Sequence, residues 1–170
     1  MVLPMAGDVG SQFTPAAGYA QAIQYRLNTL NDKEYAGAIA VVLSGEGAVA
    51  TNGFWSALTM ATTLKLPMLF YIEDNGYAIS VTSEKQTPGK NIAKNLASFE
   101  NLKIIEGDGC DPVDASKKIS QAVRFVRKHQ GPALIRLTVP RLSGHSGQDT
   151  QAYKSKSLLE EENQRDPLAR

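Results

Sequence analysis

Two short polar clusters contain the residue types that could hold a metal ion and a phosphate group. The first, SGEGA, has glycines on both sides of Glu46, which let the backbone turn sharply and approach a ligand closely. The second, EDNGY, places a carboxylate and an amide side by side at Asp74 and Asn75. Carboxylates, amide oxygens and loop carbonyls are the oxygen ligands that magnesium prefers, together with water and substrate phosphates. The chemistry that these residues suggest is a diphosphate held through a metal ion.

Both clusters also have an ordinary structural interpretation. A glycine-flanked acidic residue after a strand is common in turns, and Asn75-Gly76 is a common turn dipeptide. Spacing alone therefore leaves a turn and a ligand site open as interpretations of each cluster.

Four short apolar runs predict buried strands, and the two polar clusters directly follow the first two. These two runs are almost continuously apolar, which is typical of strands covered on both faces. Helices are predicted to begin at Thr14-Pro15, where a capping hydroxyl precedes proline, and at Asp111-Pro112. The predicted strands are 38–43, 68–72, 102–105 and 133–139, with a further helix over 53–64 and a charged terminal helix or partly ordered tail over 155–170.

This alternation predicts an α/β fold, a parallel sheet with helices on both faces. Open parallel sheets bind ligands at the carboxyl ends of their strands, so both clusters are expected at the ligand-binding edge. We expect one domain, with its core in residues 1–150 and a polar tail or terminal helix of the same domain in residues 151–170. The stretch 77–99 has little periodicity and predicts a functional or mobile loop.

The composition argues against several classes of partner and location. A net charge of +1 gives no electrostatic footprint for nucleic acid or an anionic membrane. No apolar run approaches the roughly 20 residues needed to span a bilayer. Cys110 is the only cysteine, which fits a reducing compartment. We expect a cytoplasmic protein, or one of the mitochondrial matrix if the organism is eukaryotic.

The clusters resemble the signature of thiamine diphosphate enzymes, a Gly-Asp-Gly followed later in the chain by Asn-Asn. The stretch FWSALTMATTLKLPMLFYIEDNGYAIS is similar to the one that follows this signature in alpha subunits of pyruvate and branched-chain 2-oxo acid dehydrogenases. RLSGHSGQDTQAYKS resembles their later loop, and Gln164 to Pro167 resembles a helix boundary near the end of their domain. The chain is therefore similar to the alpha subunit, or the alpha half of a fused chain, of the decarboxylating component of 2-oxo acid dehydrogenase complexes.

This resemblance implies bound thiamine diphosphate and Mg²⁺. It assigns the side chains of Glu46 and Asn75 and the main-chain carbonyl of Tyr77 as metal ligands. Backbone N–H groups of the first cluster would bind the diphosphate, the backbone of the AGDVGSQ loop would hold the aminopyrimidine ring, and His145 would be the candidate catalytic residue near the diphosphate. The cofactor-binding positions implied are Gly7, Val9, Gly45, Glu46, Gly47, Ala48, Asn75, Tyr77 and His145.

The sequence departs from the family pattern at Glu46, at Asp74 and at its amino-terminal end. Glu46 replaces an aspartate and Asp74 replaces the first asparagine, as in fused members, so metal binding is expected to survive. Ser146 matches a regulatory phosphorylation position of some eukaryotic members, although we expect no such regulation here. The amino-terminal part of the family's alpha subunit is missing, so Met1 is expected to begin a fragment or a reduced form.

The function implied is decarboxylation of a 2-oxo acid, with transfer of the acyl group to a lipoyl group on a partner acyltransferase. The activating glutamate would come from a beta subunit or beta half, so this chain is expected to act in an oligomer and to be inactive alone. Other interpretations stay open: a transketolase-like or synthase class of thiamine diphosphate enzyme, or a non-catalytic scaffold fragment. A nicotinamide-binding domain is disfavoured because no G-x-G-x-x-G opens a helix.

Overall fold

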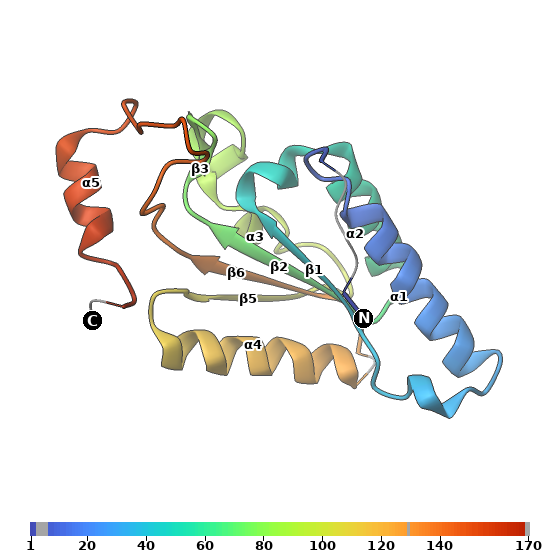
Figure 1. Cartoon of the computed structure of the whole chain (residues 1–170). Coiled ribbons are helices and arrows are strands. Elements are labelled where there is room, and N and C mark those ends of the chain that lie inside the picture. Colours follow the sequence, from blue (N-terminus) through green and yellow to red (C-terminus); the bar gives the residue numbers. More distant parts are fainter. Residues whose placement is uncertain (3–6, 129, 169–170) are drawn as a thin grey trace.

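A four-stranded parallel sheet forms the centre of the computed structural model, which describes residues 1–2, 7–128 and 130–168. All neighbouring strands run parallel, so their carboxyl ends meet at one edge (Figure 1). The four predicted strands are confirmed, with shifts of up to three residues at their ends. In the order of the sheet they are β1 (Ala40–Gly45), β2 (Met68–Asp74), β6 (Ala133–Thr138) and β5 (Lys103–Asp108).

Helices cover both faces of the sheet, as predicted. On one face lie α1 (Phe13–Asn28) and α2 (Asn52–Leu64), and on the other lies α4 (Pro112–Arg127) (Figure 1). The helix α5 (Lys156–Asn163) lies beyond the carboxyl ends of the strands. It lies within residues 155–170, for which the sequence left a terminal helix or a partly ordered tail open. No helix in the described ranges is long and apolar enough to cross a membrane.

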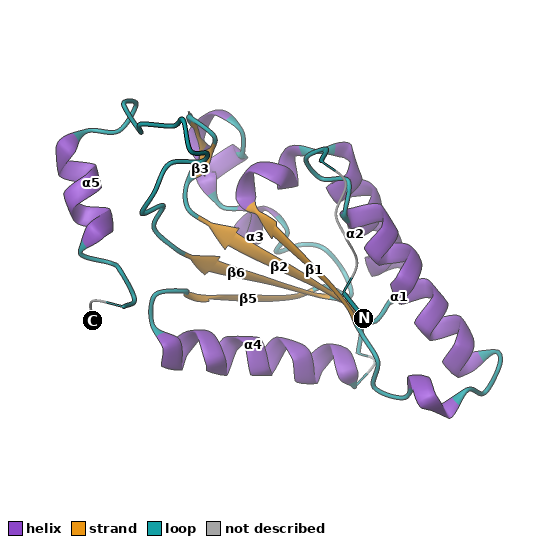
Figure 2. Cartoon of the chain, in the orientation of Figure 1, coloured by secondary structure: helices purple, strands orange, loops and turns teal. Residues whose placement is uncertain are grey.

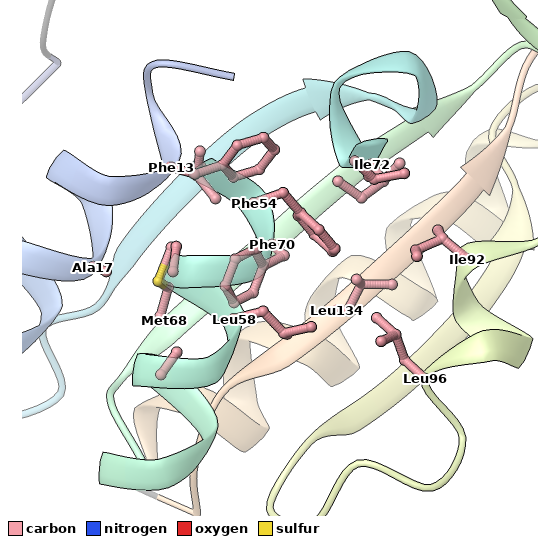
Figure 3. Packing of buried hydrophobic residues seen from close by; sticks show 14 of the residues in the cluster. Phe13, Ala17, Phe54, Leu58, Met68, Phe70, Ile72, Ile92, Leu96 and Leu134 are labelled. Carbon is pink, nitrogen blue, oxygen red and sulfur yellow. The ribbon is translucent and has the colours of Figure 1, made fainter. Parts of the chain in front are cut away.

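Three phenylalanine rings fix α1 and α2 over the second strand. Phe13 of α1 and Phe54 of α2 meet edge to face at 5.3 Å, and Phe70 of β2 lies 6.3 and 5.8 Å from them. Figure 3 shows these rings together, with Leu134 of β6 extending the same buried cluster. Because Phe54 follows the first polar cluster and Phe70 precedes the second, these aromatic contacts help to hold the two clusters together.

The helix starts agree only in part with the sequence. Asp111 caps α4 as predicted, since its carboxylate accepts hydrogen bonds from the N–H groups of Val113 and Asp114. The predicted Thr14 cap is wrong, because α1 begins at Phe13 and Gln12 precedes it without a side-chain cap. The Gln12 amide instead donates to the carbonyl of Leu43, 3.4 Å away, and so ties the start of α1 to the end of β1.

The prediction that β1 is covered on both faces is wrong. Val42 is buried beneath α1 and α2, but Val41 is exposed and Leu43 has 63% of its surface exposed. β1 is an edge strand, and α4 packs over β5, β6 and part of β2 without reaching it. The prediction holds better for β2, where Leu69, Phe70 and Ile72 are all buried.

The stretch that lacked periodicity contains several short elements rather than one long loop. A hairpin of β3 (Tyr77–Ala78) and β4 (Val81–Thr82) is followed by the 3-10 turns Ser83–Lys85 and Pro88–Lys90 and by α3 (Ile92–Asn95). Elements this short carry no readable period. The turns and loops around the hairpin gather at the arrowheads of the strands (Figure 2).

Candidate functional site

The structure brings Glu46 and Asn75 together at the carboxyl edge of the sheet. Glu46 follows β1 and opens a 3-10 turn (Glu46–Ala50), while Asn75 follows β2, the parallel neighbour of β1. The Glu46 carboxylate accepts a hydrogen bond from the backbone N–H of Asn75 at 3.1 Å. The two polar clusters are therefore in direct contact, as the sheet topology predicted.

The Glu46 carboxyl group is buried, with 3% of the residue exposed. One oxygen bonds to Asn75, and the other, Oε1, is buried with no hydrogen-bond partner among the described residues. Burial and the nearby charge of Asp74 raise the pKa of Glu46 to about 7, and the backbone N–H groups of Asn75, Glu46 and Tyr77 offset only part of this rise. A buried carboxylate with an unpaired oxygen is costly unless a positive charge accompanies it, so this group fits a cation ligand.

A tight turn presents the other two predicted metal ligands. The Asn75 side-chain oxygen accepts from the N–H of Tyr77 at 3.1 Å, and the Asp74 carboxylate accepts from the N–H of Gly76 at 3.0 Å. The Tyr77 carbonyl accepts from the Arg141 guanidinium at 3.0 Å. A carbonyl oxygen has two lone pairs, so the oxygens of Asn75 and Tyr77 each have one left for a ligand.

The loop after β1 leads into the start of α2. The Ala48 carbonyl accepts from the Thr51 hydroxyl at 2.8 Å, and the Thr51 oxygen accepts in turn from the N–H of Phe54 and caps the helix. A side chain at Gly47 would place its Cβ 2.7 Å from that of Ala78 in the hairpin. Only glycine fits at position 47, because the β3–β4 hairpin packs directly against this loop. The cofactor contacts assigned to Gly45, Gly47 and Ala48 stay predictions.

The loop that carries Gly7 and Val9 is docked beside the same region. It approaches the first turn of α2 so closely that a Cβ on Gly53 would lie 2.7 Å from the carbonyl oxygen of Gly10. Gly10 has a φ of +82° and also abuts the Thr51 side chain. Gly7 and Val9 are exposed, and their backbone contacts with a cofactor stay predictions.

His145 lies in the loop that follows β6. Its backbone N–H donates to the Asp149 carboxylate at 2.8 Å, which lowers the pKa of Asp149. Tyr153 donates to the same carboxylate, and its ring lies 5.6 Å from the ring of Tyr77. These contacts connect the His145 loop to the turn after β2. The His145 residue itself is exposed, so its catalytic role stays a prediction.

Besides Arg141, sequence reasoning missed two further cations that hold the site. Arg136 of β6 forms an ion pair with Asp74 at 2.5 Å. Its position as a charged residue in the apolar run ALIRLT could have indicated a buried ion pair. The Lys154 side chain is fully buried, pairs with Glu162 of α5 at 2.6 Å and lies over the Tyr77 ring. No sequence pattern distinguished Lys154 from the solvated lysines around it.

The donor set at this edge is one carboxylate with neutral oxygens. No group of three or more His, Cys, Asp or Glu side chains that could hold a metal occurs within residues 1–2, 7–128 and 130–168. A carboxylate, an amide oxygen and a main-chain carbonyl match the chemistry of magnesium, which also binds water and phosphate oxygens.

The whole chain, residues 1–170, matches the family model described as "Dehydrogenase E1 component". The chain belongs to the dehydrogenase E1 component family. It is 28% identical over 164 residues to the pyruvate dehydrogenase E1 component subunit alpha of Bacillus subtilis, covering 95% of this chain and 42% of that protein. The corresponding subunit of Rickettsia felis is 31% identical over 162 residues, with 95% and 47% covered. A 2-oxoisovalerate dehydrogenase subunit alpha of Bacillus subtilis is 32% identical over 130 residues, with 76% and 39% covered.

These relatives confirm the resemblance to alpha subunits of the E1 family, and the chain spans less than half of their length. Solved structures support the fold. A protein from Mycobacterium smegmatis described as a thiamin diphosphate-dependent enzyme matches with a TM-score of 0.54 and 22% identity, over 79% of this chain and 23% of that one. Benzoylformate decarboxylase from Polynucleobacter necessarius matches with a TM-score of 0.54 and 15% identity, over 79% and 24%.

Proposed function

We propose that this E1-family chain binds Mg²⁺ and the diphosphate of thiamine diphosphate as the alpha-type part of a 2-oxo acid dehydrogenase. The single observation that carries the proposal is the contact between Glu46 and Asn75, in which one carboxylate oxygen is buried and unpaired. The names of the relatives support the reaction class, pyruvate or 2-oxoisovalerate dehydrogenation. Activity, substrate and partners are part of the proposal, because the chain spans less than half of those relatives.

In this proposal the metal is held by the Glu46 carboxylate, the Asn75 side-chain oxygen and the Tyr77 carbonyl. The N–H groups of Gly47 and Ala48 bind the diphosphate, at a loop that leads into a helix start, where anions are favoured. Bound thiamine diphosphate supplies an electron sink for the decarboxylation of a 2-oxo acid, while the protein supplies binding and orientation.

Further residues would hold and shield the remainder of the cofactor. The backbone of Gly7 and Val9 would contact the aminopyrimidine ring, from a loop that the Gly10–Gly53 contact already docks against α2. His145 would lie over the diphosphate. Its loop is connected to Tyr77 through Asp149 and Tyr153.

The proposal includes partner subunits. The carboxylate that activates the cofactor would come from a beta subunit or beta half, and the acyl product would pass to a lipoyl group on an acyltransferase. Mixing the chain with a beta subunit and following 2-oxo acid decarboxylation tests this part. Turnover by the purified chain alone would contradict the need for a beta partner.

A thermal-shift experiment tests the binding site directly. The melting temperature is measured with Mg²⁺, with thiamine diphosphate, with both and with neither. Stabilisation only with both is expected, because a ligand that binds the folded chain raises its stability. Glu46→Gln should lose the stabilisation. Glu73→Gln is the matched control, since Glu73 is an exposed carboxylate near the carboxyl end of β2, paired with Gly45 of β1.

The outcomes separate the alternatives. Equal stabilisation of the wild-type chain and the Glu46→Gln variant would mean that the cofactor does not use this carboxylate. No stabilisation under any condition would contradict the binding site itself.

A further inference from the structure

Asp74 places a second carboxylate beside the proposed metal ligands. It stands where the thiamine diphosphate signature has a neutral asparagine, and only 6% of its surface is exposed. Its oxygen Oδ1 accepts from the N–H of Gly76 at 3.0 Å and so shapes the turn that carries Asn75 and Tyr77. A buried charge at this position needs a partner, because an uncompensated carboxylate would turn toward water and release the turn.

Arg136 provides that partner from the neighbouring strand. Its Nε lies 2.5 Å from Asp74 Oδ2, and its Nη1 lies 2.7 Å from the Glu106 carboxylate of β5. One guanidinium therefore bridges three adjacent strands, β2, β6 and β5. Glu106 also accepts from the Asn91 amide at 2.9 Å, at the start of α3. Both oxygens of Asp74 are consequently in use, one for the turn and one for Arg136.

We infer that Arg136 is a positioning residue: it neutralises Asp74 and holds its carboxylate in the orientation that keeps Asn75 and the Tyr77 carbonyl in place. The guanidinium suits this role because it is planar and donates to two carboxylates at once, which a lysine cannot do in the same geometry. The part of the inference that concerns metal affinity rests on the proposed function. The part that concerns the turn does not.

The turn is tested on the whole chain without ligand. Backbone amide NMR signals of Asn75 and Gly76 are compared in the wild type, Arg136→Gln, Asp74→Asn and the double variant. Arg136→Gln should shift both signals, speed their hydrogen exchange and lower the melting temperature by about 5–10 °C, because it leaves a buried charge unpaired. Asp74→Asn should restore both signals in the Arg136→Gln background, because an amide oxygen can still accept from Gly76 without carrying a charge.

Metal affinity is tested with Mn²⁺ in the presence of thiamine diphosphate, from the electron paramagnetic resonance signal of free Mn²⁺. Arg136→Gln should weaken Mn²⁺ binding by about 10- to 100-fold, as expected when a group that orients metal ligands is lost. The double variant should bind Mn²⁺ with an affinity within about 3-fold of the wild type, a much smaller loss than that expected for Arg136→Gln alone. Arg165→Gln is the matched control, since Arg165 and Arg136 line one pocket together with Asp74 and Asn75, but Arg165 pairs with Asp108.

Three results would overturn the inference: unchanged Asn75 and Gly76 signals in Arg136→Gln, a double variant no better than Arg136→Gln, or an equal loss in Arg165→Gln. A wild-type chain that binds no Mn²⁺ would refute the proposed function and the metal-affinity part. The amide signals would then still decide whether Arg136 holds the turn.

Discussion

At the scale of single residues, Glu46 is placed where the charge of its carboxylate costs stability. Its carboxyl group is buried, faces the charge of Asp74 and leaves one oxygen unpaired. Burial and the charge of Asp74 favour the protonated form and raise the pKa of Glu46 from 4.5 to about 7. A bound divalent cation would reverse this preference, because it favours the ionised carboxylate.

The pH dependence of stability follows from this pKa. Between pH 4.5 and about 7 the folded chain holds a proton on Glu46 that the unfolded chain has lost. The free energy of unfolding of the metal-free protein should therefore fall as pH rises through this window, by about 3 kcal/mol from this group, and stay level above it. Glu46→Gln should remove this fall and exceed the wild type in stability at pH 8.

Urea unfolding of both proteins at several pH values between 4.5 and 8 measures the difference. Parallel pH profiles of the wild type and Glu46→Gln would show that Glu46 titrates normally in the folded chain. With Mg²⁺ and thiamine diphosphate added, the wild type should become more stable than Glu46→Gln at pH 8.

The residues at the site could be predicted from sequence only where they follow the ends of strands. Glu46 and Asn75 could be found because each lies in a polar cluster that directly follows an apolar run, and the resemblance to the thiamine diphosphate signature assigned them as metal ligands. Arg136 and Lys154 could not be assigned partners, because their contacts with Asp74 and Glu162 depend on the pairing of β2 with β6 and on the packing of α5. Such contacts are properties of the tertiary structure.

At the scale of elements, the contact between the 7–12 loop and α2 depends on the absence of side chains. Gly10 and Gly53 let a loop carbonyl approach the first turn of the helix. The sequence predicted the helix over 53–64 nearly to the residue, but it gave no reason for a glycine in its first turn. The reason is a neighbour more than forty positions earlier in the chain.

Gly53→Ala should destabilise the chain by about 1–3 kcal/mol, because the added Cβ must displace the Gly10 carbonyl. The matched control is Gly18→Ala, an exposed site in α1 with nothing within 4 Å of its Cβ. That substitution should stabilise by about 0.5–1 kcal/mol, since alanine is the better helix former. Urea unfolding compares the two, and equal effects would contradict the close approach.

At the scale of the whole molecule, the two faces of the sheet are covered unequally. On the α1–α2 face, residues of β1, β2 and β6 lie in one buried cluster and Ile104 of β5 packs against it, whereas α4 leaves β1 open on the other face. The order of strands and helices predicted the layers correctly. It could not predict this gap, because the apolar run of β1 has the same composition whether or not a helix lies over it.

Leu43 and Leu69 give a direct measure of this difference, since they lie on the same face of adjacent strands. Leu69 is 1% exposed and Leu43 is 63% exposed. Leu69→Ala should cost about 2–5 kcal/mol of stability, and Leu43→Ala less than about 1 kcal/mol. Denaturant midpoints of the isolated chain give both values. A large loss from Leu43→Ala would indicate that something covers this face in solution.

The buried ammonium of Lys154 connects the carboxyl-terminal segment to the turn after β2. It spans from α5 to the Tyr77 ring and also donates to the Arg141 carbonyl at 3.0 Å. A recombinant version trimmed after Thr150 would keep each residue proposed to touch the cofactor, yet its Tyr77 would lose this anchor. We expect such a trimmed protein to bind Mn²⁺ with thiamine diphosphate more weakly than the intact one, which calorimetric titration of the two would reveal.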